Sequence, residues 1–296
     1  MIKKTPFYVK LLIVWLFCLS SCVSGCTSIP LTSSPEKEIL PRTSFVQIQH
    51  SIELEGCGLD PDTKKSRCQK AVMRYASSGA YVFHSEVSES ISYVLTAGHS
   101  CENKIPQTQN VEGYKVINKG SVFRVVDLNG TKHPAEVILI NKRFDLCLLK
   151  VNHVFTRYPI LKLAAKEPLR GESVFNMAAP HGLFWPGTVL LFKGIFSGYH
   201  NRGYSIYTIP TKPGSSGSPI VNKDNELIGV IFAGYPSMEN IALSSPLVAI
   251  KVFLKKAIAI GEMKIWEKDN KPKVNTQVDR IWMEEMKAKL EKVFGN

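Results

Sequence analysis

The chain has 296 residues, of which 44% are hydrophobic, and this is enough for one large globular domain or two modest ones. Its formal net charge is +12, or +9 without the three lysines near the N-terminus. Such a charge attracts anionic partners over long range, but no basic motif interleaved with aromatic residues is present. We therefore expect a solvated basic surface and no nucleic-acid partner.

Residues 1–21 predict an export signal. Three lysines precede the apolar run Leu11–Leu19, which is too short to span a membrane as a helix. The following Leu-Ser-Ser-Cys run, which ends at Cys22, resembles the lipobox of bacterial lipoproteins. This resemblance implies cleavage before Cys22 and a lipid on that cysteine, so that the protein would be anchored to a membrane of the cell envelope. Cys26 ends a second match, and secretion without lipid is the alternative.

Residues 22–43 predict a solvated tether because they are rich in Ser, Thr and Pro. The folded part should begin near Ser44, because the next residues alternate between apolar and polar with the period of a half-buried strand. The apolar members of this alternation are Val46, Ile48, Ile52 and Leu54.

Residues 79–249 predict an all-β region. Many short apolar runs are separated by Gly, Pro and Asn turns, which favours a sandwich or a barrel. The predicted strands form a first group (Tyr81–Phe83, Tyr93–Leu95, Val122–Val126, Val137–Ile140 and Leu146–Val151) and a second group (Val174–Met177, Thr188–Phe192, Ile206–Ile209, Pro219–Val221, Leu227–Phe232 and Ile241–Leu243).

Three residues in this region predict nucleophilic catalysis. His99 follows an apolar strand, Asp145 precedes another, and Ser216 lies in a Gly-Ser-Ser-Gly-Ser-Pro turn. A serine hydroxyl is a weak nucleophile until a base takes its proton, and a histidine, with a pKa of about 6.5, suits that role near neutral pH. A carboxylate on the far ring nitrogen fixes the tautomer. We therefore assign Ser216 as nucleophile, His99 as base and Asp145 as the orienting carboxylate.

Asp127 is the rival carboxylate. It opens an Asp-Leu-Asn-Gly-Thr run, which is typical of a hairpin turn. We therefore expect a structural role for Asp127.

The order His99, Asp145, Ser216 and the residues around them resemble the trypsin-like serine peptidases. The runs at residues 212–219 and 178–182 are similar to motifs of the bacterial Deg/HtrA and glutamyl-endopeptidase kinds. We expect no PDZ module, because few residues follow position 260. The resemblance implies two six-stranded antiparallel β-barrels over residues 44–260, with the three residues in the cleft between them.

The same resemblance implies a serine endopeptidase that acts on a protein or peptide through an acyl-enzyme. The backbone N–H groups of Gly214 and Ser216 would stabilise the oxyanion. We expect neither a metal nor a cofactor. A catalytically silent envelope lipoprotein that only binds partners is the alternative, but such a protein has no chemical need to keep all three residues.

The substrate pocket is also placed by this resemblance. None of its positions carries a carboxylate that could receive Lys or Arg, so we expect a small or medium apolar side chain before the scissile bond. The pocket positions are Pro210, Thr211, Lys212, Phe232, Ala233, Gly234 and Ala242.

Export would permit disulfides. Cys57 and Cys68 bracket a polar loop and could pair with each other. Alternatively, one of them could pair with Cys101, since trypsin-like relatives often have a paired cysteine two residues after the histidine. Cys147 lies in an apolar strand and is expected to be an unpaired, packed thiol.

Two helices follow the strands, and residues 261–296 form a C-terminal helical extension. The first helix has Ser245 as its cap residue, Pro246 at its first helical position and an apolar stripe. The second begins at Thr276 with a capping-box pattern. We expect this last helix to pack on the barrel, with a partner-binding or membrane-facing role as the alternative.

Overall fold

The computed structural model describes residues 40–59, 65–103, 105–111, 114–153, 158–269 and 276–294. All of them fall in one unit that begins at Leu40. The predicted signal sequence, Cys22, Cys26 and the tether up to residue 39 lie outside the described residues.

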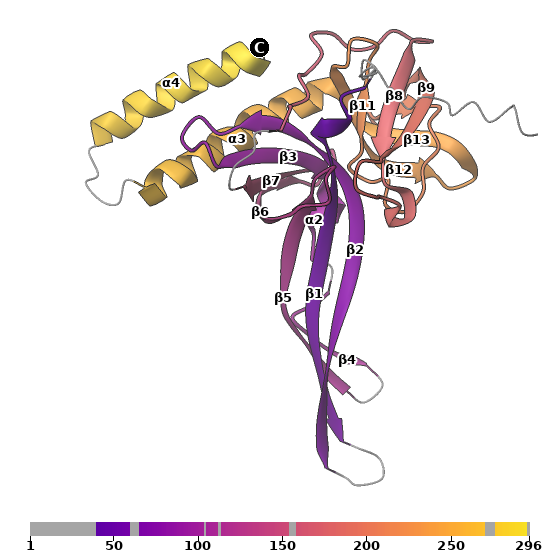
Figure 1. Cartoon of the computed structure of the whole chain (residues 1–296), viewed down its shortest axis with the longest axis vertical. Coiled ribbons are helices and arrows are strands. Elements are labelled where there is room, and N and C mark those ends of the chain that lie inside the picture. The colour runs from indigo at the N-terminus through magenta and orange to yellow at the C-terminus, as the bar shows by residue number, and fades with distance from the viewer. Residues whose placement is uncertain are drawn as a thin grey trace, which may run out of the picture. The chain divides into compact units, whose positions relative to one another are not determined.

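Six antiparallel strands close the first barrel (Figure 1). Their order is β1-β2-β3-β7-β6-β5, and β5 returns to pair with β1, while β4 adds to the outer part of β5. The bounds are β1 (Phe45–Leu59), β2 (Ser66–His84), β3 (Ile91–Ala97), β4 (Thr108–Val111), β5 (Tyr114–Val126), β6 (Lys132–Asn141) and β7 (Leu146–Asn152).

Six further strands close the second barrel in the order β10-β13-β12-β11-β8-β9. The predicted all-β fold with two six-stranded barrels is therefore confirmed, and each predicted strand overlaps an observed one. The bounds are β8 (Ser173–Ala178), β9 (Leu190–Tyr199), β10 (Ser205–Tyr207), β11 (Pro219–Val221), β12 (Leu227–Tyr235) and β13 (Met238–Pro246).

The two barrels share a buried apolar layer. On β3, Val94 packs inside the first barrel, whereas its neighbour Leu95 faces the layer that also contains Val230 of β12 and Ile250 of the following helix. Because successive strand residues point to opposite faces, both faces of β3 are buried. Each such aliphatic side chain contributes about 1.5–3 kcal/mol when fully buried. This layer fixes the first barrel against the second.

The β1–β2 hairpin is much longer than predicted. The sequence predicted a polar loop between Cys57 and Cys68, but the described residues on either side of 60–64 continue the two strands. Residues 66–76 of β2 are exposed, so the hairpin lacks the apolar alternation by which strands are recognised. Cys57 lies opposite Cys68 and forms a disulfide with it, one of the two pairings left open. We call residues 52–59, 66–76 and 114–121, together with β4, the stalk.

Two helices complete the fold: α3 (Leu247–Asp269) and α4 (Thr276–Phe294). α4 packs against α3, where Trp282 stacks on Trp266. No helix in the described ranges is both long and apolar enough to cross a membrane.

A buried carboxylate of α3 anchors the helix to the first barrel. Glu262 is fully buried, and its Oε1 accepts a 2.7 Å hydrogen bond from the hydroxyl of Tyr93 on β3. Its Oε2 accepts the backbone N–H groups of Glu86 and Val87 in the β2–β3 loop, at 2.9 and 3.3 Å. The helix is therefore attached to the barrel by polar as well as apolar contacts.

Candidate active site

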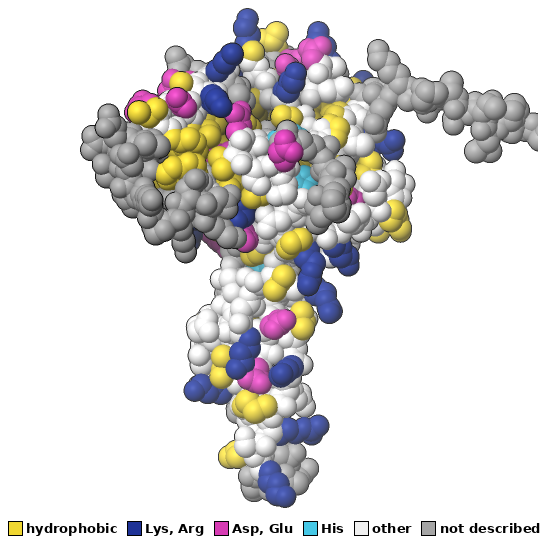
Figure 2. Space-filling view, turned by 60° about the vertical axis from the view of Figure 1, so that its left-hand side comes forward, with side chains coloured by type: hydrophobic (Ala, Val, Ile, Leu, Met, Phe, Trp, Pro, Cys, Tyr) yellow, Lys and Arg dark blue, Asp and Glu magenta, His cyan; other side chains and the backbone are white. Residues whose placement is uncertain are grey.

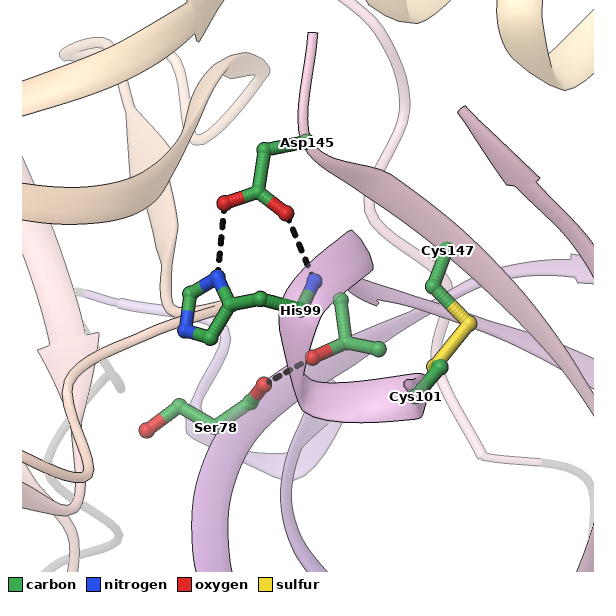
Figure 3. The surroundings of a disulfide bond; sticks show 6 residues. Ser78, His99, Cys101, Asp145 and Cys147 are labelled. Atoms are coloured by element: carbon green, nitrogen blue, oxygen red, sulfur yellow. Dashed lines mark hydrogen bonds and ion pairs between the residues drawn. A yellow bond between two sulfur atoms is a disulfide. The ribbon is translucent and has the colours of Figure 1, made fainter. Parts of the chain in front are cut away.

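Strands β3 and β7 bring His99 and Asp145 together. In their antiparallel register, Ala97 at the end of β3 lies opposite Leu146 at the start of β7. The short helix α2 (Gly98–Cys101) then carries His99 to the carboxylate of Asp145. His99 Nδ1 lies 2.6 Å from Asp145 Oδ2, and the His99 backbone N–H donates to Oδ1 over 2.6 Å (Figure 3).

This approach requires glycine at position 98. A Cβ there would lie 2.8 Å from Asp145 Oδ1 and 3.1 Å from the backbone of Leu146. Asp145 itself has a φ of 51°, in the left-handed region that Asp tolerates better than most residues. The backbone conformations of Gly98 and Asp145 therefore allow the Asp145 carboxylate to reach the His99 imidazole.

A disulfide joins Cys101 of α2 to Cys147 of β7 (Figure 3). The expectation of an unpaired Cys147 is therefore wrong: this strand position faces the interior of the first barrel, where α2 ends, so it meets a second cysteine. The bond spans a sequence separation of 46 residues. It ties together the two elements that carry His99 and Asp145.

Ser216 comes from the second barrel, in the turn between β10 and β11. Its Oγ lies 2.9 Å from His99 Nε2. Gly214 and Gly217 shape this turn with φ values of +96° and +84°. A Cβ on Gly217 would lie 2.1 Å from the carbonyl oxygen of Ser78, so the turn is pressed closely against the first barrel. The structure thus brings the three predicted residues into one hydrogen-bonded line.

Ser78 of β2 holds the turn in place. Its backbone N–H donates to the Ser216 carbonyl over 2.8 Å, and its Oγ donates to the Gly214 carbonyl over 2.8 Å. The same Oγ accepts the backbone N–H of Ala179 at 3.0 Å, and Thr96 Oγ1 donates to the Ser78 carbonyl over 2.7 Å. Sequence reasoning missed Ser78, because a Ser-Ser-Gly run reads as a turn.

The carbonyl of the peptide bond between Pro213 and Gly214 points away from the Ser216 side chain. The Pro213 carbonyl accepts the His181 backbone N–H over 2.5 Å, in the 3-10 turn η2 (Pro180–Gly182). In a trans peptide the N–H points opposite to the C=O. The Gly214 N–H therefore points away from η2. Among the hydrogen bonds of the described residues, the N–H groups of Gly214 and Ser216 donate to no protein acceptor.

Asp127 lies in a separate buried cluster of the first barrel. Its Oδ1 accepts the backbone N–H groups of Asn129 and Thr131, both at 2.9 Å, which is the hairpin geometry expected from the sequence. Its Oδ2 accepts from Tyr158 and lies 3.0 Å from His133 Nε2. Asp127 therefore orders a turn, and the described residues contain no cluster of three or more His, Cys, Asp and Glu placed to hold a metal ion.

A cleft of about 370 Å³ lies beside Ser216 on the second barrel. Of the predicted pocket residues, Thr211, Lys212, Ala233 and Gly234 line it. Ala242 is buried in the core of the second barrel, and Pro210 and Phe232 are not among the lining residues. Sequence reasoning missed the contribution of the β12–β13 turn: Tyr235, Pro236, Met238 and Glu239.

Glu239 is a carboxylate on the wall of this cleft. Lys212 Nζ lies 2.7 Å from its Oε1, and this hydrogen bond lowers the pKa of Glu239 below its ordinary value. Its charge is therefore matched from within the protein rather than by a substrate cation.

Three comparisons relate the chain to known proteins. The family model of a trypsin-like peptidase domain matches residues 77–230. Over 124 residues the chain is 31% identical to a probable periplasmic serine endoprotease, DegP-like, of Buchnera aphidicola subsp. Baizongia pistaciae (strain Bp), which covers 39% of this chain and 26% of that protein. The crystal structure of the serine endoprotease from Yersinia pestis matches with a TM-score of 0.52 and 20% identity over 75% of this chain and 65% of that one.

The chain spans about a quarter of the length of the DegP-like relative and just under two thirds of the crystallised one. At 20% identity, the structural match shows the fold alone.

Proposed function

The chain belongs to the trypsin-like peptidase family, and on that premise we propose that it is a serine endopeptidase that cleaves protein or peptide substrates through a Ser216 acyl-enzyme. The observation that carries this proposal is the hydrogen-bonded line from Ser216 Oγ through the two ring nitrogens of His99 to Asp145. The side chains in this line have the types and distances that general-base activation of a serine needs.

In the proposed reaction, His99 Nε2 takes the Ser216 proton as Oγ attacks the substrate carbonyl carbon. The tetrahedral intermediate collapses, the C–N bond breaks, and His99 donates that proton to the leaving amine. Water then repeats the sequence on the acyl-enzyme, releases the acid and regenerates the serine. Asp145 stays ionised, accepts from Nδ1–H and stabilises the imidazolium.

The N–H groups of Gly214 and Ser216 are our candidates for oxyanion donors. The support is that neither donates within the described residues and that the Pro213 carbonyl is engaged by His181. Preorganised donors of this kind act without reorganisation, and losing one typically lowers turnover about 10²- to 10³-fold.

We propose that the cleft beside Ser216 takes a small or medium apolar side chain before the scissile bond. Ile231, Ala233 and Met238 supply apolar wall, and Lys212 already matches the charge of Glu239. A cationic substrate side chain would have to displace Lys212.

We further propose that the protein works in the cell envelope and is attached to a membrane through lipid on Cys22. The lipobox-like run supports the lipid, and the DegP-like relative is described as periplasmic. Two disulfides in the described residues fit an oxidising compartment outside the cytoplasm.

A fluorophosphonate probe tests the catalytic proposal, because only an activated serine reacts readily with it. We expect labelling of the wild type and of Ser218→Ala, and none of Ser216→Ala or His99→Ala. Ser218 is the matched control because it lies in the same turn, with its Oγ engaged by Asn176. Labelling that persists in Ser216→Ala, or a wild type that stays unlabelled, would overturn the assignment.

A further inference from the structure

β2 leaves the active site with one open edge. On one side it pairs with β1 without interruption from Ser66 to Ala80. On the other side β3 pairs with it only from Ala80 to His84. Within the part of the chain that the structure describes, no strand pairs with the second edge of β2 between Ser66 and Ser77, and this length of β2 extends into the stalk (Figure 1).

The hydrogen bonds of Ser78 identify which groups face this edge. Its N–H donates to Ser216 and its C=O accepts from Thr96, so both point away from β1. Along an antiparallel ladder this direction alternates from residue to residue, and the β1–β2 register has no shift. The N–H and C=O groups that point to the open edge are therefore those of Ala76, Arg74, Val72 and Lys70.

The open edge begins in a second cleft beside the nucleophile. This cleft, of about 280 Å³, is lined by Ser216, His99, Ser77, Ala76 and Tyr75 among other residues. His99 must protonate the leaving amine, so the leaving part of a substrate lies on the His99 side of Ser216. The cleft on the other side, which includes Thr211, is not lined by His99.

A leaving segment that passed from Ser216 into the stalk would run from Ala76 toward Ser66. Because β2 runs from Ser66 toward Ala76, such a segment would be antiparallel to it. An extended peptide that adds to an open strand edge in this way gains regular main-chain hydrogen bonds.

Basic side chains outnumber acidic ones on the stalk. Figure 2 shows dark blue Lys and Arg side chains along this narrow extension. On β2, Arg67 and Arg74 form no ion pair with a described residue, and β2 carries no acidic residue. Lys70 lies opposite Glu55 on β1, and its charge helps to lower the pKa of Glu55. The acidic side chains of the described stalk are Glu53 and Glu55, and Glu55 is already paired with Lys119 at 2.6 Å. An acidic segment would therefore match this edge in charge.

We propose that the open edge of β2 from Ala76 to Lys70 binds the part of the substrate that follows the scissile bond, as an added antiparallel strand, and favours Asp and Glu there. This inference rests on the proposed function of Ser216 and names its substrate class: an extended chain with about six to eight residues after the cleaved bond, which is the length that strand pairing along residues 70–76 requires.

Binding to the full-length Ser216→Ala protein tests the inference. The probes are fluorescent peptides with the same apolar residues before the bond, followed by two residues or by eight alternating Asp and Thr residues, measured by anisotropy. We expect at least tenfold tighter binding of the long acidic peptide, and weaker binding when Asn replaces Asp. Equal affinity for the short and long peptides would overturn the proposal.

An N-methyl scan of the long peptide separates strand addition from charge attraction. Methylation should weaken binding at every second residue only, because alternate N–H groups face β2. A uniform effect would contradict the inferred pairing.

Two pairs of substitutions locate the binding edge. Lys70→Gln with Arg74→Gln should weaken binding more than Lys115→Gln with Arg124→Gln, which removes the same charge from β5. Equal losses would assign the effect to the net charge of the first barrel and would contradict binding at the edge. Val72→Pro removes an N–H group that points to the open edge and breaks no hydrogen bond to β1. It should weaken peptide binding about as much as N-methylation of the peptide residue that pairs with position 72.

The two proposals can fail separately. If the fluorophosphonate probe labels the wild type but the Ser216→Ala form binds short and long peptides equally, the catalytic assignment stands and the proposed binding at the edge is wrong. An unlabelled wild type whose Ser216→Ala form shows the alternating methyl pattern keeps the edge and loses catalysis.

Discussion

Ser78 and Ser216 belong to different barrels and are joined by a 2.8 Å hydrogen bond from the Ser78 backbone N–H to the Ser216 carbonyl. His99 and Asp145 also belong to the barrel of Ser78. The first barrel therefore carries two of the three proposed catalytic residues and directly positions the third.

Ser78→Ala should reduce both peptide hydrolysis and stability. The substitution leaves the Gly214 carbonyl and the Ala179 N–H without their buried partner, at a cost of about 1–3 kcal/mol each. A turn displaced by about 1 Å can lower turnover about 100-fold. Hydrolysis of a fluorogenic peptide and urea unfolding measure the two effects. Lower stability with wild-type turnover would leave Ser78 a purely structural residue.

Asp145→Asn should lower turnover by about 10⁴-fold with little loss of stability, because the amide can hold the imidazole in the wrong tautomer. Asp127→Asn is the matched control and should do the reverse, because the Asp127 carboxylate accepts four hydrogen bonds, two of them within its turn, and none joins it to the Ser216 line. The opposite pattern would make Asp127 the third catalytic residue.

Stability should fall in two steps as the pH is lowered. Burial lowers the pKa values of His50 and His153 below the ordinary 6.5, and for His153 the charges of His133 and His84 lower it further while that of Asp127 raises it. The stability from these neutral imidazoles is complete above their unfolded pKa and is lost as the pH falls through the folded values. We expect the first step below about pH 6.5.

Asp127 should produce the second step. Burial raises its pKa, but hydrogen bonds from Tyr158, His133 and Thr131 outweigh burial and leave the pKa below its ordinary value. Its stabilisation is present above the unfolded pKa of about 3.9 and is lost as the pH falls through the folded value. Urea unfolding between pH 3 and 8 measures both steps. His153→Gln should reduce the first step alone, and a flat wild-type profile from pH 5 to 8 would contradict this account.

Replacing Cys101 and Cys147 together by Ser should lower the free energy of unfolding by about 4 kcal/mol, because the disulfide closes a long loop in the unfolded chain. The corresponding Cys57 and Cys68 double variant should lose about 3 kcal/mol or less, since its loop is short. It should also keep its turnover of a short peptide, because that bridge lies beyond the proposed binding edge and away from Ser216. Equal unfolding with and without reductant would show that neither bridge forms.

Cys22 should carry the lipid. Metabolic labelling with an alkyne fatty acid in a bacterial host, followed by detergent partitioning, should mark the wild type and Cys26→Ser but not Cys22→Ser. Label lost only in Cys26→Ser would move the site. An unlabelled wild type in the aqueous phase would indicate a secreted protein.

The sequence predicted the strands because each of them buries at least one face, so that runs such as Leu146–Val151 are apolar or alternate. The choice of two barrels over a sandwich came from the resemblance to trypsin-like peptidases. It failed on the stalk for the opposite reason: residues 66–76 are exposed, so no apolar alternation marks them as a strand, although they pair with the neighbouring strand β1. The partner of Cys147 was missed because the meeting of α2 with β7 depends on strand register. Ser78 was missed because its partners Ser216 and Gly214 belong to the other barrel and lie far from it in the sequence.

The buried carboxylate of α3 limits the modularity of this protein. A shortened chain that ended at residue 260 would contain every strand but would lack Glu262, leaving Tyr93 and the Glu86 and Val87 N–H groups without their acceptor. It would also lose the part of α3 after residue 260 and would expose the apolar side chains on which that part packs. The two barrels alone are therefore not an independently stable unit, and any chimeric protein that contains them must also include α3.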